Sequence, residues 1–165
     1  MSGYDISKKA VLFLRAYWDV WTAERIWFGD PNNAVWQCVL AVEKTLKGFL
    51  DCSSVYYGNV HELPELLENV ETVHKLTDEC EASVLFLSRY KSGLRYKSMK
   101  DDPAPEDARL AISHAKSVMD EFKSIRIVAQ LMNEAHEVYT KMLKSNYEKY
   151  ADIDISGDKQ DNSSN

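Results

Sequence analysis

Five side chains of this sequence could contact a nucleotide or a phosphate. Lys44 and Lys47 stand near the end of the apolar segment AVWQCVLAVEKTLKGFL, where they could flank a bound phosphate. His61 could transfer a proton or contact a base. Arg95 and Tyr96 put a charge next to an aromatic face, a combination suited to nucleotides. Together these side chains predict a nucleotide- or phosphate-binding site.

Each of these side chains also has a purely structural interpretation. Lysine is favoured in the C-terminal half of a helix because it complements the helix dipole. A histidine that opens a helix beside Glu62 is commonly a hydrogen-bonding residue of the structure. Arg95 could equally form an ion pair with Glu43 or Asp101. The residues alone leave both interpretations open.

Several classes of catalytic or cofactor site are excluded by their missing motifs. The sequence has no HExxH, no CxxC, no paired carboxylate–histidine spacing, no nucleophile elbow and no glycine-rich phosphate loop. We therefore expect no metal and no cofactor, and neither an autonomous metalloenzyme nor an NTPase. The cysteines Cys38, Cys52 and Cys80 are scattered and odd in number, which predicts free thiols and a cytoplasmic location.

Length and charge predict one domain with an acidic tail. A chain of 165 residues is long enough to bury about 70% of its unfolded surface without disulfides. Near the start, charged residues from Arg15 to Arg25 interrupt the apolar run too early for a signal peptide or a membrane span. The segment Ala151–Asn165 has four aspartates against one lysine, and its polar composition predicts disorder.

The remaining charge limits how the protein could bind nucleic acid. The net charge is −6, of which −3 falls on residues 1–150, and these form no basic block. This argues against tight, sequence-independent binding to a nucleic-acid backbone but leaves room for a local phosphate pocket.

The spacing of apolar residues predicts that helices carry these side chains, and no alternation typical of β-strands is found. Asp30 is predicted to cap the second helix, with Pro31 in its first turn. The predicted helices cover about Ile6–Phe28, Pro31–Leu50, His61–Val70, Thr72 to Ser92-Gly93, and Glu106 to Tyr150. We expect an all-α antiparallel up-and-down bundle of four to five helices in residues 1–150, with a long C-terminal helix.

The C-terminal helix is too long for such a bundle. From Glu106 to Ser156 there is no glycine or proline, and an unbroken helix to Tyr150 would span about 65 Å at 1.5 Å per residue. Either the helix breaks near Lys123–Arg126 and folds back, or its end projects and packs against another chain.

In this order, these segments resemble the HEPN family (higher eukaryotes and prokaryotes nucleotide-binding domains) over about Leu12–Lys123, especially its branch paired with minimal nucleotidyltransferases. The segment AVEKTLKGFL is similar to the family pattern Gln-Ala-x-Glu-Lys-x-Leu-Lys-Ala, and His61-Glu62-Leu63 to its His-Asp-Leu. Arg95-Tyr96 resembles its Arg-Tyr-Pro element, and EDARLAISHAKSVMDEF its last helix. The resemblance implies a helical bundle, usually dimeric, that binds nucleotides or RNA.

Many HEPN members are metal-independent ribonucleases that use an arginine followed four to six residues later by a histidine. At the usual position of that motif, Arg95 is followed by Tyr96-Lys97-Ser98-Met99-Lys100-Asp101, without a histidine. Arg109 and His114 have the required spacing, but they lie inside the last family helix, and Leu110 replaces the usual polar residue. They are the candidate catalytic residues if the protein is an enzyme.

Three hypotheses follow. In the first, the protein is a non-catalytic HEPN module that binds a nucleotide or RNA, or that partners a nucleotidyltransferase or a toxin or antitoxin in a defence system. In the second, it is a ribonuclease in which Arg109 and His114 meet across a homodimer, with arginine stabilising the phosphorane and histidine moving protons. In the third, it is a structural adaptor that docks through its C-terminal helix.

Overall fold

The computed structural model describes residues 6–90 and 102–150, and within them every regular element is a helix. The all-α prediction is therefore confirmed for this part of the chain. The predicted tail, residues 151–165, lies outside it. The elements are η1 (Lys8–Ala10), α1 (Val11–Ile26), α2 (Pro31–Cys52), α3 (Leu63–Glu71), α4 (Asp78–Leu87), α5 (Pro105–Ser124) and α6 (Arg126–Tyr150).

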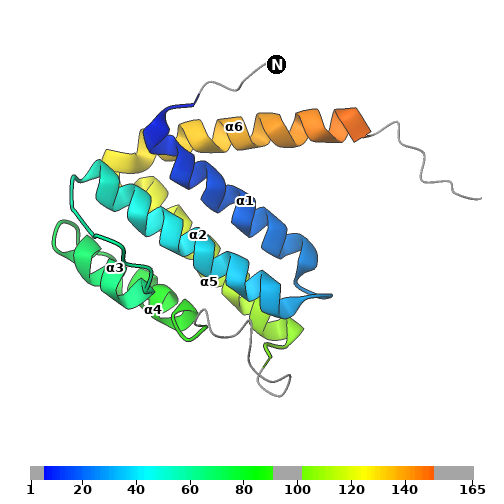
Figure 1. Ribbon diagram of the computed structural model, residues 1–165, viewed down its shortest axis with the longest axis horizontal. Coiled ribbons are helices and arrows are strands. Elements are labelled where there is room, and N and C mark those ends of the chain that lie inside the picture. The colour runs from blue at the N-terminus through cyan, green and yellow to red at the C-terminus, as the bar shows by residue number, and fades with distance from the viewer. Residues whose placement is uncertain (1–5, 91–101, 151–165) are drawn as a thin grey trace, which may run out of the picture.

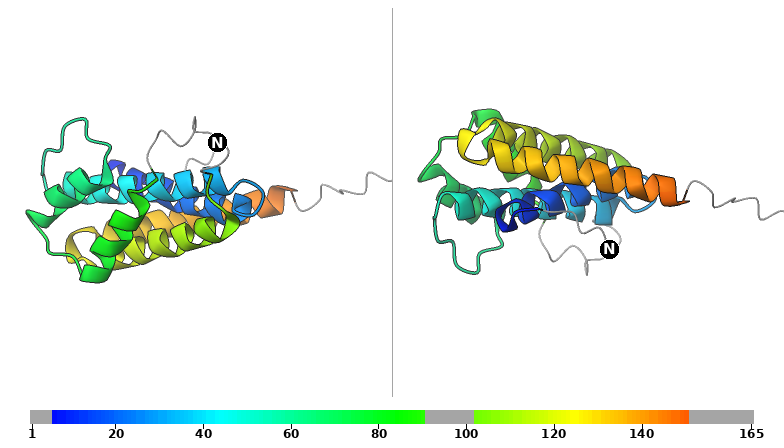
Figure 2. Two further views of the ribbon diagram at one scale, coloured as in Figure 1. Left: turned by 90° about the horizontal axis from the view of Figure 1, so that it is seen from below. Right: turned by 90° about the horizontal axis from the view of Figure 1, so that it is seen from above.

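The helices α1 and α2 run side by side in opposite directions (Figure 1). Asp30 joins them as predicted, because its carboxylate accepts the backbone N–H of Asn33 at 3.0 Å and Pro31 occupies the first turn of α2. Phe13 of α1 is fully buried against α2 at Gly48, which has no side chain to keep the ring away. These two helices form one layer, and α5 and α6 form the other (Figure 2).

The predicted starts of α3 and α4 were wrong. His61 precedes α3, which begins at Leu63. The helix expected from Thr72 begins only at Asp78, because Thr77 acts as its N-cap and accepts the N–H of Cys80 at 3.2 Å. Glu121 of α5 holds this cap in place, accepting the Thr77 backbone N–H at 2.8 Å and its hydroxyl. Residues before Thr77 instead connect α3 to α4.

The helix predicted from Glu106 to Tyr150 breaks between Lys123 and Arg126 and folds back, which is the first of the two alternatives. Ile125 has extended backbone angles (φ −77°, ψ 120°), so α5 ends at Ser124 and α6 turns back across α1 (Figure 1). The first half of α6 buries Val128, Met132 and Ala135 in the core, and its later turns are largely exposed. This half of α6 is therefore part of the folded domain.

Candidate functional site

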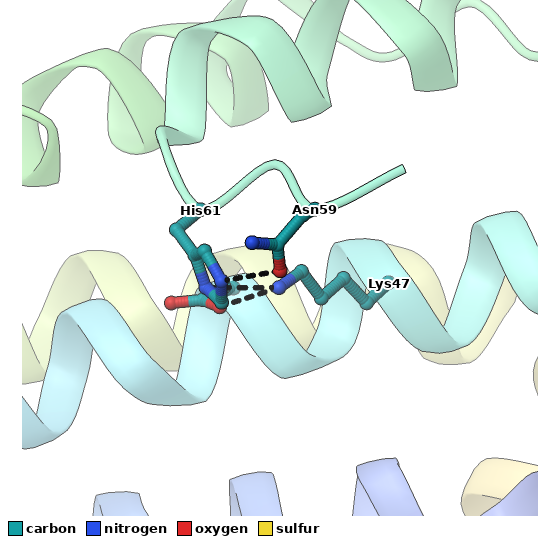
Figure 3. Close-up of polar contacts among 4 residues, drawn as sticks. Lys47, Asn59 and His61 are labelled. Carbon is teal, nitrogen blue, oxygen red and sulfur yellow. Dashed lines mark hydrogen bonds and ion pairs between the residues drawn. The ribbon is translucent and has the colours of Figure 1, made fainter. Parts of the chain in front are cut away.

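His61 attaches the loop before α3 to the middle of α2. Its Nδ1 lies 2.8 Å from Oε1 of Glu43, and the same oxygen accepts the ammonium of Lys47 at 2.7 Å (Figure 3). Lys47 Nζ is also 3.2 Å from the ring Nδ1, while the other ring nitrogen is 3.2 Å from Asn59 Oδ1. We call Glu43, Lys47, Asn59 and His61 the Glu43 cluster. The cluster joins α2 to the loop before α3, and its members Lys47 and His61 are 14 residues apart in the sequence.

The members of the Glu43 cluster differ in their exposure to solvent. The side chains of Glu43 and Lys47 are 13% and 14% exposed, whereas that of His61 is 63% exposed. A partly buried ion pair keeps its geometry because both charges lose their partner if either side chain moves away. His61 is thus held at Nδ1 by a fixed pair and at Nε2 by Asn59, while most of its side chain stays exposed.

A cavity of about 290 Å³ adjoins the Glu43 cluster. Most of its wall is apolar, and two aromatic residues, Trp36 and Tyr90, contribute to it. The Tyr90 hydroxyl is a hydrogen-bond donor at neutral pH, and burial raises its pKa further from that range. The lining residues are Trp36, Val39, Leu40, Glu43, His61, Glu62, Leu63, Ser88 and Tyr90. Apolar walls with a few convergent polar groups are typical of small-molecule sites.

The second predicted lysine points elsewhere. Lys44 forms an ion pair with Asp19 of α1, whereas Lys47 contacts Glu43 and the loop before α3. Burial raises the pKa of Asp19, although its hydrogen bond to Lys44 acts in the opposite direction. The structure therefore brings Lys47 and His61 together and places Lys44 between α1 and α2. Arg95 and Tyr96 lie outside the described residues.

Arg109 and His114 face different neighbours of α5. The guanidinium carbon of Arg109 is 5.8 Å from the ring centre of Trp27, at the end of α1. His114 faces α4, where its Nδ1 is 3.0 Å from Ser83 Oγ and its ring lies 4.3 Å from that of Phe86. Five residues along a helix rotate a side chain by about 140°. Within one chain these two residues do not form a common site.

His114 nevertheless has one property of a general base. Burial, and secondarily the charge of Arg89, lowers its pKa, so the neutral ring is favoured. The arginine that acts on His114 within the chain is thus Arg89, in the turn after α4, which the sequence motif did not indicate.

Two residues of the Glu43 cluster were not predicted as site residues. The i,i+4 spacing of Glu43 and Lys47 could have suggested their ion pair from the sequence. Nothing in the sequence indicated Asn59, because the loop that carries it has no regular periodicity.

The described residues contain no group of three or more histidine, cysteine or acidic side chains arranged to hold a metal ion. Cys38, Cys52 and Cys80 are free thiols, and burial raises the pKa of both Cys38 and Cys80 to about 12. None of the helices in residues 6–90 and 102–150 is long and apolar enough to cross a membrane.

The fold and the site thus describe an all-helical protein with a polar cluster beside a small aromatic-lined cavity. The family model of the HEPN domain matches residues 12–125, well over half of the chain, and the chain belongs to this family of nucleotide-binding and ribonuclease-like modules. A search of curated proteins and a search of solved structures each found no match.

Proposed function

We propose that this chain is a HEPN module that binds a nucleotide or an RNA end at the Glu43 cluster and does not cleave RNA. The observation that carries this proposal is the convergence of Lys47 and His61 beside an aromatic-lined cavity. A base or another flat group would occupy the cavity, and the phosphate would contact the rim. The family membership supports a ligand of this class.

The proposed roles follow from the contacts. Lys47 supplies a positive charge, and His61 supplies a ring that is 63% exposed and whose Nε2 would exchange Asn59 Oδ1 for a ligand oxygen. Glu43 positions both side chains and lowers the net charge of the site. Binding therefore depends on the base in the cavity as well as on the charge of the phosphate. This agrees with the absence of a basic block in the sequence.

Two lysines on the same helix give a matched test of this proposal. Isothermal titration calorimetry would compare wild type, Lys47→Met and Lys44→Met with AMP and with a 5′-phosphorylated RNA hexamer. Both variants remove one ammonium and one ion pair, but only Lys47 lies at the proposed site. Loss of one charged hydrogen bond, worth about 1.5–3 kcal/mol, predicts a roughly 10- to 150-fold weaker affinity for Lys47→Met and little change for Lys44→Met.

Two results would contradict the proposal. One is a wild-type protein that binds neither AMP nor the hexamer, and the other is an equal loss of affinity in both lysine variants. Circular dichroism of each variant checks that the fold is intact, and His61→Gln provides a second site variant at an exposed position.

The alternative function is a metal-independent ribonuclease, and the neutral, oriented ring of His114 is the observation that favours it. Because Arg109 of the same chain faces Trp27, this function requires a second copy to bring an arginine to His114. Cleavage of tRNA or total RNA in the presence of chelator, lost in both Arg109→Ala and His114→Ala, would establish it. We expect no cleavage.

We further propose a four- to five-helix antiparallel bundle that acts as a cytoplasmic homodimer, with a nucleotidyltransferase or a toxin or antitoxin as its partner. The HEPN membership supports this assembly, and the exposed later turns of α6 offer a surface for it. Arg95 and Tyr96 stay predicted nucleotide contacts. Purification of the tagged protein under native conditions, with sedimentation to measure its mass, tests the dimer and the partner together.

A further inference from the structure

A second cavity lies where α5 turns into α6. It is formed by the last turn of α2, the connection between α3 and α4, and the residues that join α5 to α6. Its volume is about 850 Å³, against about 290 Å³ for the cavity beside the Glu43 cluster. This volume falls within the range of small-molecule sites, which is about 300–1,000 Å³.

Three basic side chains line this corner cavity: His74, Lys75 and Arg126. Within the described residues, Lys75 and Arg126 take part in none of the ion pairs. The pKa of Glu81 is raised, chiefly by a hydrogen bond with Glu71. The positive charge of Lys75 opposes this shift. The first turn of α6, which begins at Arg126, has no acidic residue that would oppose an anion.

The acidic side chain that lines the corner cavity is already engaged. Glu121 accepts the backbone N–H of Thr77 at 2.8 Å and the Thr77 hydroxyl. These contacts fix the carboxylate as part of the α4 cap. The two permanent positive charges of the lining therefore exceed its negative charge by one.

Exposed apolar groups lie beside these charges. Val73 is 49% exposed and Ile127 is 50% exposed, and both line the corner cavity together with Phe49. Such side chains favour a ligand whose body is apolar or aromatic, since its burial removes apolar surface from water. A free inorganic anion would leave this surface uncovered.

From these observations we infer that the corner cavity is a second ligand site, which binds a phosphate ester with an apolar or aromatic body. Lys75 and Arg126 contact the phosphate, and Val73 and Ile127 contact the body. The inference goes beyond the function proposed above, because it concerns different residues and does not require ligand at the Glu43 cluster.

A ¹H–¹⁵N NMR titration of the full chain with AMP separates the two sites, because each has its own amide signals. We expect saturable shifts at Lys75, Arg126 and Ile127. The apparent Kd should rise at least tenfold in the double variant Lys75→Met/Arg126→Gln and stay unchanged in Lys144→Met, a cation on the exposed part of α6. Adenosine and inorganic phosphate, added separately, should each bind at least tenfold more weakly than AMP.

The inference is overturned if millimolar AMP leaves these amides unshifted, if adenosine shifts them as strongly as AMP, or if the double variant keeps its affinity. Shifts at Asn59 and His61 report on the Glu43 cluster in the same spectra. Either site can therefore fail without affecting the conclusion about the other.

Discussion

Replacing Gly48 with alanine should destabilise the protein, although alanine is the better helix former. In an exposed helix this change would stabilise by about 1 kcal/mol. Here a Cβ built on Gly48 lies 2.8 Å from both Cε1 and Cζ of Phe13, closer than carbon atoms pack. The Phe13 ring is fully buried, so it can move away only by displacing other core side chains.

The expected size of the effect follows from two opposing contributions. Overpacking of a filled core costs about 1–3 kcal/mol, and the helix preference offsets about 1 kcal/mol of that. Gly48→Ala should therefore lower the free energy of unfolding by up to about 2 kcal/mol.

Urea denaturation followed by circular dichroism measures this change. The double variant Phe13→Leu/Gly48→Ala provides the control, because a smaller side chain at position 13 removes the clash. In the Phe13→Leu background, Gly48→Ala should be neutral or stabilising, which gives a coupling energy of about 1–3 kcal/mol. A stability gain of about 1 kcal/mol from Gly48→Ala alone would refute the described packing of α1 on α2.

Three further predictions concern titration, thiol reactivity and the last helix. Burial, and then the charge of Asp120, raises the pKa of Tyr17 to about 12. Its contribution to the free energy of unfolding is therefore complete below pH 10 and is lost as the pH rises towards 12. Tyr17→Phe should flatten this part of the pH profile of stability in urea. Iodoacetamide at pH 8 should label half-buried Cys52 in the native protein and Cys38 only after unfolding, as mass spectrometry would show; equal native labelling would contradict the burial. Truncation after Ser124 should unfold the protein, whereas truncation after Thr140 should leave a cooperative thermal transition, because the buried side chains of α6 precede Thr140; equal transitions would contradict this.

Much of the fold could be predicted because its signals are local. The Gly29-Asp30-Pro31 turn ends one helix and caps the next through a single carboxylate, so its residues determine both boundaries. The start of α4 was placed too early, because Val73 and Leu76 continue the apolar spacing of the helix. The cap at Thr77 is held by Glu121, which is 44 residues away, and no local pattern reveals that contact.

The candidate site was predictable only in its residue types. Lys47 and His61 were chosen for their chemistry, but their convergence depends on Glu43, which both contact, and on the path of the loop before α3. Lys44 was grouped with Lys47 because they are close in sequence, yet Asp19 of α1 attracts it to another helix. The spacing of Arg109 and His114 likewise says nothing of the helices that each side chain faces.

The central claim is that the Glu43 cluster is where the nucleotide binds, and the ring of His61 reports on it most directly. We would follow the ¹H and ¹⁵N signals of this ring by NMR while AMP is added. The account predicts that these signals shift and saturate, and that Lys47→Met raises the Kd obtained from them at least tenfold while Lys44→Met leaves it unchanged. Ring signals that stay unchanged while AMP binds would place the nucleotide elsewhere and contradict the account.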